Sequence, residues 1–125
     1  TYWKNKVVFH SPEYVVSEIQ HCIRKYGAKS FQIFDDSFTA NKERVFKIAY
    51  LIKKNKIDSR FMCLTRTDIL DEDLIKALKT IGIKYISFGI ESGDEKILKS
   101  IGKNIKISAI ERALELCKRF NIDSC

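Results

Sequence analysis

Hydrophobic positions along the chain follow two alternating spacings. Apolar residues recur at the period of about 3.6 that predicts amphipathic helices after Ser11, from about residue 41, and over 71–81 and 108–120. Short apolar runs between these segments predict strands: SFQIF at 30–34, RFMCLT at 60–65 and KYISFGI at 84–90. A short helix is expected after residue 94, and NIDSC at 121–125 resembles the start of another strand.

Residues suited to helix ends flank these segments. Ser11 suits an N-cap, and Pro12 suits the first helical position, where its missing N–H costs nothing. Asp71 is expected to cap the third long helix. Ser108 and Glu111 have the spacing of a capping box, which predicts that the last helix begins there.

The order of the elements predicts the fold class. Strand ends are expected near Asp35, Thr65 and Glu91, so a strand recurs about every 26 to 30 residues. Helices alternating with strands at this period predict βαβ units and a parallel sheet. Right-handed crossovers place the carboxyl ends of such strands on one edge, where both barrels and open sheets bind ligands. The polar residues expected there are Asp35-Asp36, Thr65-Arg66 and Glu91-Ser92.

The adjacent carboxylates of Asp35 and Asp36 raise the question of a counter-charge, because like charges this close are costly unless a cation or donor meets them. Strand alternation puts Asp36 in phase with Gln32, so we favour Asp36 as the carboxylate that faces the ligand side. Arg66 would add a cation to the same edge. Two anionic groups and one cationic group would suit a zwitterion, whose ammonium meets carboxylate and whose carboxylate meets guanidinium.

Composition and charge narrow the classes of protein. The 125 residues are 45% hydrophobic, enough for one ordinary domain core. The net charge of +7 allows a nucleic-acid partner, but the lysines are scattered, which favours solvated helix faces. No window approaches the roughly 18–20 apolar residues of a membrane span, and no signal peptide is visible, so we expect a cytoplasmic protein.

The four cysteines, at 22, 63, 117 and 125, lack the close spacing of a metal site. Buried free thiols that behave as small hydrophobic side chains are the favoured interpretation, and a disulfide framework is not expected in a reducing compartment.

Three motifs carry a resemblance to a known family. DDSFT at 35–39, LTRTD at 64–68 and GIESG at 89–93, in this order, resemble the catalytic half-barrel of radical S-adenosylmethionine (radical SAM) enzymes. The likeness covers nearly the whole chain. It is to a branch whose members often carry a cobalamin-binding domain and include many methyltransferases and methylthiotransferase-like proteins. The resemblance implies a fragment of a (β/α)6 partial TIM-type barrel.

The family likeness implies a role for each polar position. Asp36, with Asp35, would bind the methionyl ammonium of S-adenosylmethionine, Arg66 its carboxylate or the substrate, and Glu91 with Ser92 the ribose. The implied chemistry of the parent enzyme is reductive cleavage of S-adenosylmethionine by a [4Fe–4S] cluster, fed by an electron donor, to a 5′-deoxyadenosyl radical that acts on an unknown substrate. A methyl- or methylthio-transferase is the expected reaction class.

The chain departs from the family in having no CxxxCxxC cluster loop. We therefore expect residues 1–125 to be a partial core domain that begins downstream of this loop and stops before the fifth of the six barrel strands. The cluster ligands would lie outside this chain, a cobalamin domain could precede it, and the fragment alone would be inactive. Its cut sheet edges could pair with another copy.

Two other classes stay open at this point. A receiver-like signalling domain also places an acidic pair after a strand, where it holds Mg²⁺, although the phosphoacceptor aspartate it needs has no counterpart here. A non-catalytic basic module that binds nucleic acid rests on charge alone. Each polar position also has a simple structural interpretation, such as an Asx turn at Asp35 or a surface ion pair between Arg66 and Asp68.

Overall fold

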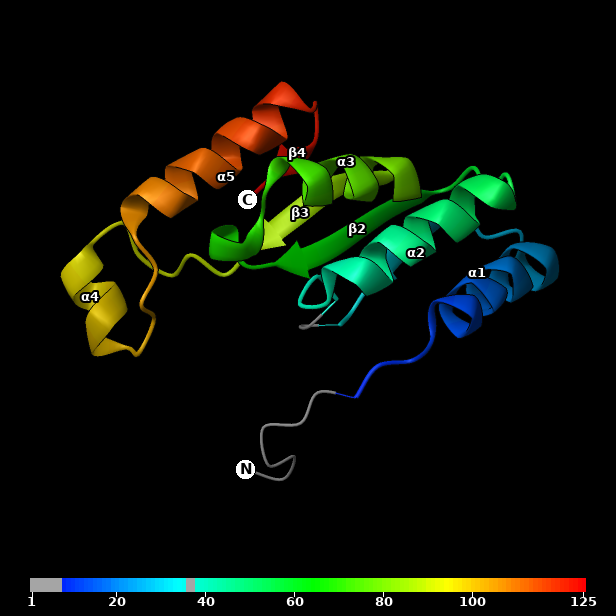
Figure 1. Ribbon diagram of the computed structural model, residues 1–125, viewed down its shortest axis with the longest axis horizontal. Coiled ribbons are helices and arrows are strands. Elements are labelled where there is room, and N and C mark those ends of the chain that lie inside the picture. The colour runs from blue at the N-terminus through cyan, green and yellow to red at the C-terminus, as the bar shows by residue number, and fades with distance from the viewer. Residues whose placement is uncertain (1–7, 36–37) are drawn as a thin grey trace.

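The computed structural model describes residues 8–35 and 38–125 of the chain. Helices and strands alternate as the sequence predicts (Figure 1): α1 (Pro12–Tyr26), β1 (Ser30–Ile33), α2 (Lys42–Lys54), β2 (Arg60–Thr65), the 3₁₀ turn η1 (Thr67–Ile69), α3 (Glu72–Ile81), β3 (Ile83–Phe88), α4 (Glu95–Ser100), α5 (Ile107–Arg119) and β4 (Asp123–Ser124). The strands β1 and β3 end one and two residues earlier than expected.

The strands form one parallel sheet in the order β1-β2-β3-β4. Each strand pairs with the next strand along the chain, so every crossover advances in the same direction. Right-handed crossovers of this kind put the helices on one face, as in a barrel. A receiver-like doubly wound sheet reverses its strand order and carries helices on both faces. The observed order therefore contradicts the receiver-like alternative and confirms the partial-barrel prediction.

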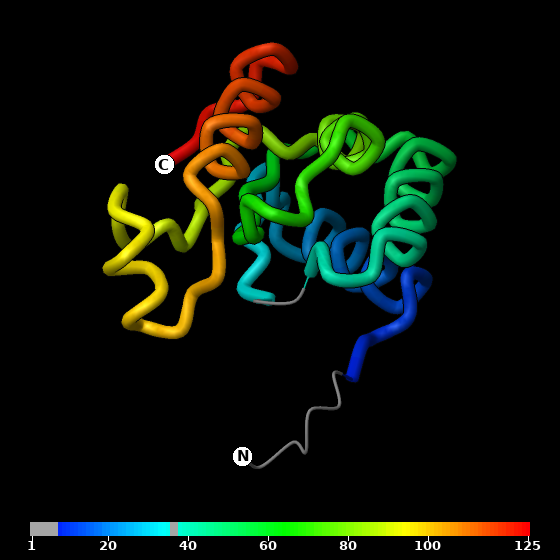
Figure 2. The backbone as a smooth tube through the Cα atoms, turned by 60° about the vertical axis from the view of Figure 1, so that its left-hand side comes forward, coloured from blue at the N-terminus to red at the C-terminus, as the bar shows by residue number. Residues whose placement is uncertain are grey.

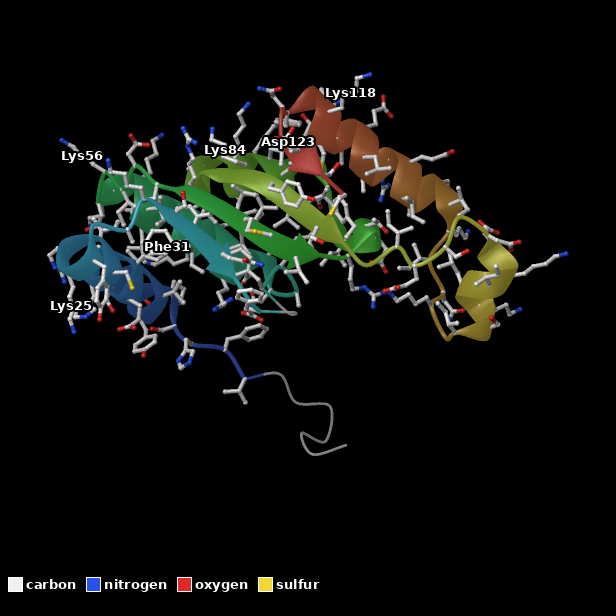
Figure 3. The ribbon with its side chains drawn as sticks, turned by 180° about the vertical axis from the view of Figure 1, so that it is seen from behind. Lys25, Phe31, Lys56, Lys84, Lys118 and Asp123 are labelled. Carbon is white, nitrogen blue, oxygen red and sulfur yellow. The ribbon has the colours of Figure 1, made fainter. Side chains whose placement is uncertain are left out.

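The core lies between that face of the sheet and the helices. The strand side chains Phe61, Cys63 and Ile86 are at most 2% exposed and join the same cluster as the buried residues of α2, α3 and α5. The intervening strand residues Met62 and Ser87 face the opposite side and are only half-buried. Successive side chains along these strands therefore point to opposite faces of the sheet. Figure 3 shows the four strands from behind with their side chains.

The unit formed by α4 and the loop after it lies apart from α1 and α2 (Figures 1 and 2). It shares a small core with α5, made by the buried side chains of Leu98, Ile105 and, from α5, Ile110. The predicted capping box at Ser108 is wrong: α5 begins at Ile107, and its N-cap residue makes no side-chain cap. Glu95 of α4 replaces that cap, because its Oε1 accepts the Ile107 N–H at 3.1 Å.

The cysteines confirm the predicted hydrophobic role where they are buried. Cys63 and Cys117 are fully covered, Cys22 is half-buried, and all four thiols, including that of the exposed Cys125, are free. Burial raises the pKa of the Cys63 thiol to about 12, so at neutral pH it is an uncharged side chain. Among the described residues, no helix has the length and apolar character needed to cross a membrane.

Candidate functional site at the carboxyl edge of the sheet

The polar residues predicted to converge do follow the carboxyl ends of neighbouring parallel strands. We call these residues the rim: Asp35 after β1, Thr65 and Arg66 at the end of β2, and Glu91 and Ser92 after β3. Asp36, the carboxylate favoured from the sequence, lies outside the described residues. The site is therefore built from the side chains around it.

Asp35 is directed toward the helices. Its Oδ2 lies 3.7 Å from Nη1 of Arg44, whose side chain is 8% exposed. Arg44 Nε also donates to the carbonyl of His10 at 3.0 Å, and its guanidinium lies over the ring of Phe38. Asp35 thus follows Ile33 toward the core, in the phase predicted for it, and has a cation within the protein.

The first described residues after the acidic pair, Phe38 and Thr39, are held by contacts with neighbouring elements. The Phe38 N–H donates to the Asp35 carbonyl at 3.0 Å, and the Phe38 side chain is 1% exposed. The next residue, Thr39, shares a buried hydroxyl–hydroxyl hydrogen bond with Thr65 at the end of β2. The described residues on the two sides of Asp36, namely Asp35 before it and Phe38 and Thr39 after it, are therefore held by contacts with their neighbours.

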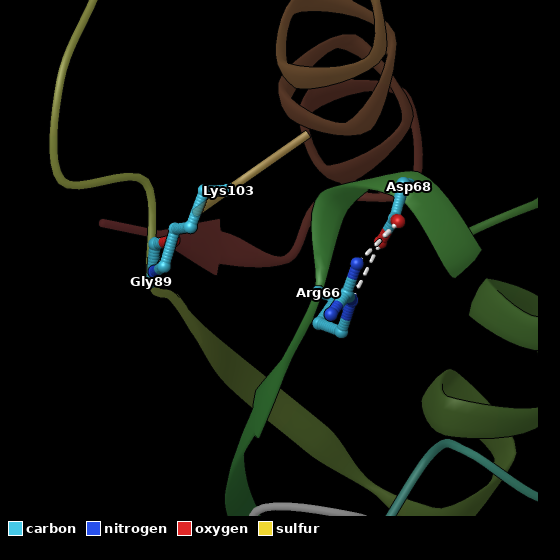
Figure 4. Close-up of polar contacts among 4 residues, drawn as sticks. All are labelled: Arg66, Asp68, Gly89 and Lys103. Carbon is cyan, nitrogen blue, oxygen red and sulfur yellow. Dashed lines mark hydrogen bonds and ion pairs between the residues drawn. The ribbon is translucent and has the colours of Figure 1, made fainter. Parts of the chain in front are cut away.

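Arg66 binds a carboxylate of its own turn. Its Nε and Nη2 donate to the two oxygens of Asp68 at 2.9 and 2.7 Å (Figure 4). These hydrogen bonds raise the pKa of Arg66 and lower the pKa of Asp68. The surface ion pair considered from the sequence is therefore present. Whether Arg66 also meets a ligand stays a prediction.

Glu91 and Ser92 sit in a tight turn after β3. Glu91 has φ +67°, an unusual value for a residue with a side chain. Its Oε1 accepts from Lys103 Nζ at 2.9 Å. The same ammonium donates to the Gly89 carbonyl at 2.7 Å, and Figure 4 draws Lys103 beside Gly89. Ser92 Oγ accepts the N–H of Asp94, the N-cap of α4.

Arg44 and Lys103 are the rim partners that sequence reasoning missed. A signal existed for Arg44, because position 44 falls one turn before Ile48 on the buried face of α2. No pattern distinguished Lys103 from the other lysines, since its partners are 12 and 14 residues away across a loop, a helix and a turn.

No metal centre is formed by the part of the chain described here: no three His, Cys, Asp or Glu side chains are grouped so as to hold an ion. The described cysteines do not provide the three converging thiolates that an iron–sulfur cluster requires. By contrast, the carboxylates, hydroxyls and guanidinium of the rim have the chemistry to bind a charged nucleoside.

Comparison with known proteins places the chain. The sequence model of the radical SAM superfamily matches residues 2–125. The chain belongs to this superfamily. An uncharacterized methyltransferase of Pyrococcus horikoshii is 34% identical over 113 residues, which are 90% of this chain and 25% of the relative. This radical SAM chain thus spans about a quarter of the length of that relative.

Solved structures support the same fold. A structure of the cobalamin-dependent S-adenosylmethionine radical enzyme OxsB, with aqua-cobalamin and S-adenosylmethionine bound, matches with a TM-score of 0.80 at 20% identity, over 91% of this chain and 19% of that one. The radical S-adenosylmethionine methyltransferase TsrM from Kitasatospora setae matches with a TM-score of 0.77 at 15% identity, over 92% and 24%. At these identities the likeness shows the radical SAM fold.

Proposed function

We propose that the rim of this radical SAM chain binds S-adenosylmethionine and that the protein containing it is a radical SAM transferase. The observation that carries the proposal is the gathering of carboxylate, guanidinium and hydroxyl groups on one edge of the sheet. In this proposal Asp36 binds the methionyl ammonium, Arg66 binds the methionyl carboxylate, and Glu91 with Ser92 binds the ribose.

The contacts of Asp35 and Arg66 support this assignment of residues to the parts of the ligand. Asp35 lies beside the buried Arg44 on the helix side of the sheet, which agrees with our sequence-based prediction that Asp36 rather than Asp35 is the carboxylate for the ligand. Arg66 uses Nε and Nη2 for Asp68. A guanidinium carries five N–H groups, so Arg66 keeps donors for a ligand carboxylate while Asp68 holds its orientation.

The chemistry would be supplied by S-adenosylmethionine together with a [4Fe–4S] cluster, and by cobalamin if the protein resembles its structural neighbours. The cluster would be held by residues other than those described here. The methyltransferase names of the Pyrococcus relative and of TsrM favour methyl transfer as the reaction class. The residues of this chain would bind, orient and shield the nucleoside, and the protein would need an electron donor.

Two further expectations belong to this proposal. The free cysteines are compatible with a reducing compartment, so we place the protein in the cytoplasm. The outer edges of β1 and β4 have no strand partner among the described residues. In the isolated chain such edges can pair with another copy, and in the complete protein with further strands.

The test uses the complete protein, purified without oxygen and reconstituted with iron and sulfide. The expected result is about four irons per chain and release of 5′-deoxyadenosine after S-adenosylmethionine and dithionite are added. Asp36→Ala should weaken S-adenosylmethionine binding and leave the iron content unchanged. Asp58→Ala, at an exposed position just before β2, serves as the control. No cluster and no nucleoside release would refute the proposal.

A further inference from the structure

The ammonium of Lys103 forms a contact at the rim that the proposed function does not use. Its Nζ lies 2.7 Å from the Gly89 carbonyl oxygen and 2.9 Å from Glu91 Oε1. The side chain is 34% exposed, so most of its length is covered. One cation therefore binds both a backbone and a side-chain oxygen of the turn that follows β3.

Lys103 reaches the rim from a loop whose backbone is held by its own contacts. It lies in the loop between α4 and α5, and its own N–H donates to the Leu98 carbonyl at 2.8 Å. Leu98 and Ile105, on either side of Lys103 in the sequence, are buried in the small core of this unit. The backbone that carries the lysine is therefore anchored in this small core, against which Ile90 of the turn also packs.

Gly89 makes room for the ammonium. A Cβ at this position would lie 3.1 Å from Lys103 Nζ and 3.5 Å from Glu91 Oε1. The ammonium would have to shift by a few tenths of an ångström, whereas the distance to Glu91 Oε1 is that of an ordinary contact. The lysine thus approaches the backbone closely at Gly89, and a side chain there would displace the ammonium slightly.

The backbone at Glu91 is held in an uncommon conformation. Its φ is +67°, and the tight turn is closed by hydrogen bonds from Ile90 N–H to the Phe88 carbonyl and from Ser92 N–H to the Ile90 carbonyl. Non-glycine residues keep such conformations only where surrounding contacts hold them. The Lys103 ammonium provides two such contacts, one on each side of Ile90.

We propose that Lys103 is a positioning residue for nucleoside recognition: it binds the Gly89 carbonyl and one oxygen of Glu91, and so presents the other oxygen of Glu91 to the vicinal hydroxyls of a ribose. The inference rests on the proposed function, because it assigns Glu91 to the ribose. The pair is too exposed to matter much for folding, since Glu91 is 55% exposed and exposed pairs contribute little to stability. We expect the pair between Lys103 and Glu91 to act instead by fixing the orientation of the Glu91 carboxylate.

The experiment compares two probes on the cluster-loaded complete protein by calorimetry. S-adenosylhomocysteine carries both ribose hydroxyls, and its 2′,3′-dideoxy form carries neither. Lys103→Met should weaken binding of S-adenosylhomocysteine about tenfold, as expected when a charge-assisted hydrogen bond is no longer held in place. It should change binding of the dideoxy form less than threefold, because that probe has no hydroxyl for Glu91 to accept from.

Two further variants complete the design. Lys99→Met removes a lysine that makes no ion pair with the described residues and should change neither affinity. Gly89→Ala displaces the ammonium without removing it. It should give a smaller loss with the same dependence on the hydroxyls, and it tests the inference even if Lys103→Met does not fold.

The outcomes separate the two proposals. Failure of the wild-type protein to bind S-adenosylhomocysteine would refute the proposed function and this inference with it. Wild-type binding that is unchanged in Lys103→Met, or that falls equally for both probes, would refute only the role of Lys103. A loss confined to the probe with hydroxyls supports it.

Discussion

The ion pair between Arg44 and Asp35 allows a direct test of the proposal that the two aspartates have different partners. If Asp35 stabilises the fold by its ion pair with Arg44 while Asp36 binds the ligand, removing the Asp35 charge should lower the free energy of unfolding, because Arg44 loses its counter-charge. A double-mutant cycle of Asp35→Asn and Arg44→Met isolates that coupling from the other contacts of either residue.

The structure sets the size of the coupling. At 3.7 Å, two unit charges interact by about 4.5 kcal/mol at an effective dielectric constant near 20 and by about 1.1 kcal/mol in water. The Arg44 side chain is 8% exposed and the Asp35 side chain 36%, so the pair lies between these limits, and solvent screening at Asp35 lowers the value. We expect a coupling of about 2 kcal/mol.

The assay is urea unfolding of the 125-residue chain, followed by circular dichroism, for the wild type, both single variants and the double variant. Asp35→Asn should cost about 2 kcal/mol in the wild-type background and less than about 0.5 kcal/mol when Arg44 is already methionine. A coupling below about 0.5 kcal/mol would refute the reasoning. Arg44 would then be held by the His10 carbonyl and the Phe38 ring, and Asp35 would become the stronger candidate for the ligand ammonium.

Three further predictions concern positions away from the rim. Asp71→Ala should cost about 1 kcal/mol in urea unfolding, since its Oδ1 caps α3 at the Leu74 N–H. The hydrogen bond from Lys42 lowers the pKa of the Asp71 carboxyl in the folded protein. The stabilisation that the Asp71 carboxylate provides is therefore present above the unfolded pKa of about 3.9 and is lost as the pH falls through the lower folded pKa. The stabilities of wild type and variant should thus converge in acid. Gly82→Ala should cost at least about 2 kcal/mol, because Gly82 has φ +99° and a Cβ would lie 2.5 Å from the Ser59 carbonyl oxygen; an unchanged urea midpoint would contradict this. The Cys63 thiol, with its pKa of about 12, should stay unmodified by iodoacetamide at pH 8 until urea unfolds the chain, and mass spectrometry of the native protein would show early labelling if this is wrong.

The sequence predicted best those features whose causes are local. Ser11 and Asp71 cap their helices as expected, because an N-cap bonds to an amide three residues on. The start of α5 was predicted wrongly for the opposite reason. Its first amide is bound by Glu95, 12 residues earlier, and no local pattern at Ser108 shows that a distant carboxylate already occupies the position.

The candidate site was predictable only as far as topology determines it. Strands at a regular period place Asp35, Arg66 and Glu91 on one edge, and that follows from the order of elements alone. The side chains that pair with these residues cannot be predicted from the order of elements. Arg44 and Lys103 reach the rim from α2 and from the loop after α4, and which side chains meet there depends on the angles of the helices and the path of the loop.

The charges of the rim share one feature that explains how an edge of a sheet can carry them. Each described charge has a counter-charge within the protein: Asp35 with Arg44, Arg66 with Asp68, and Glu91 with Lys103. Isolated charges at a partly covered edge would cost desolvation energy in the absence of a ligand, and pairing removes much of that cost. A ligand would then bind to the oxygens and N–H groups that these ion pairs do not use, and the ion pairs would hold those groups in position. Affinity at this rim should therefore depend on the partners Arg44, Asp68 and Lys103 as well as on the residues that touch the ligand.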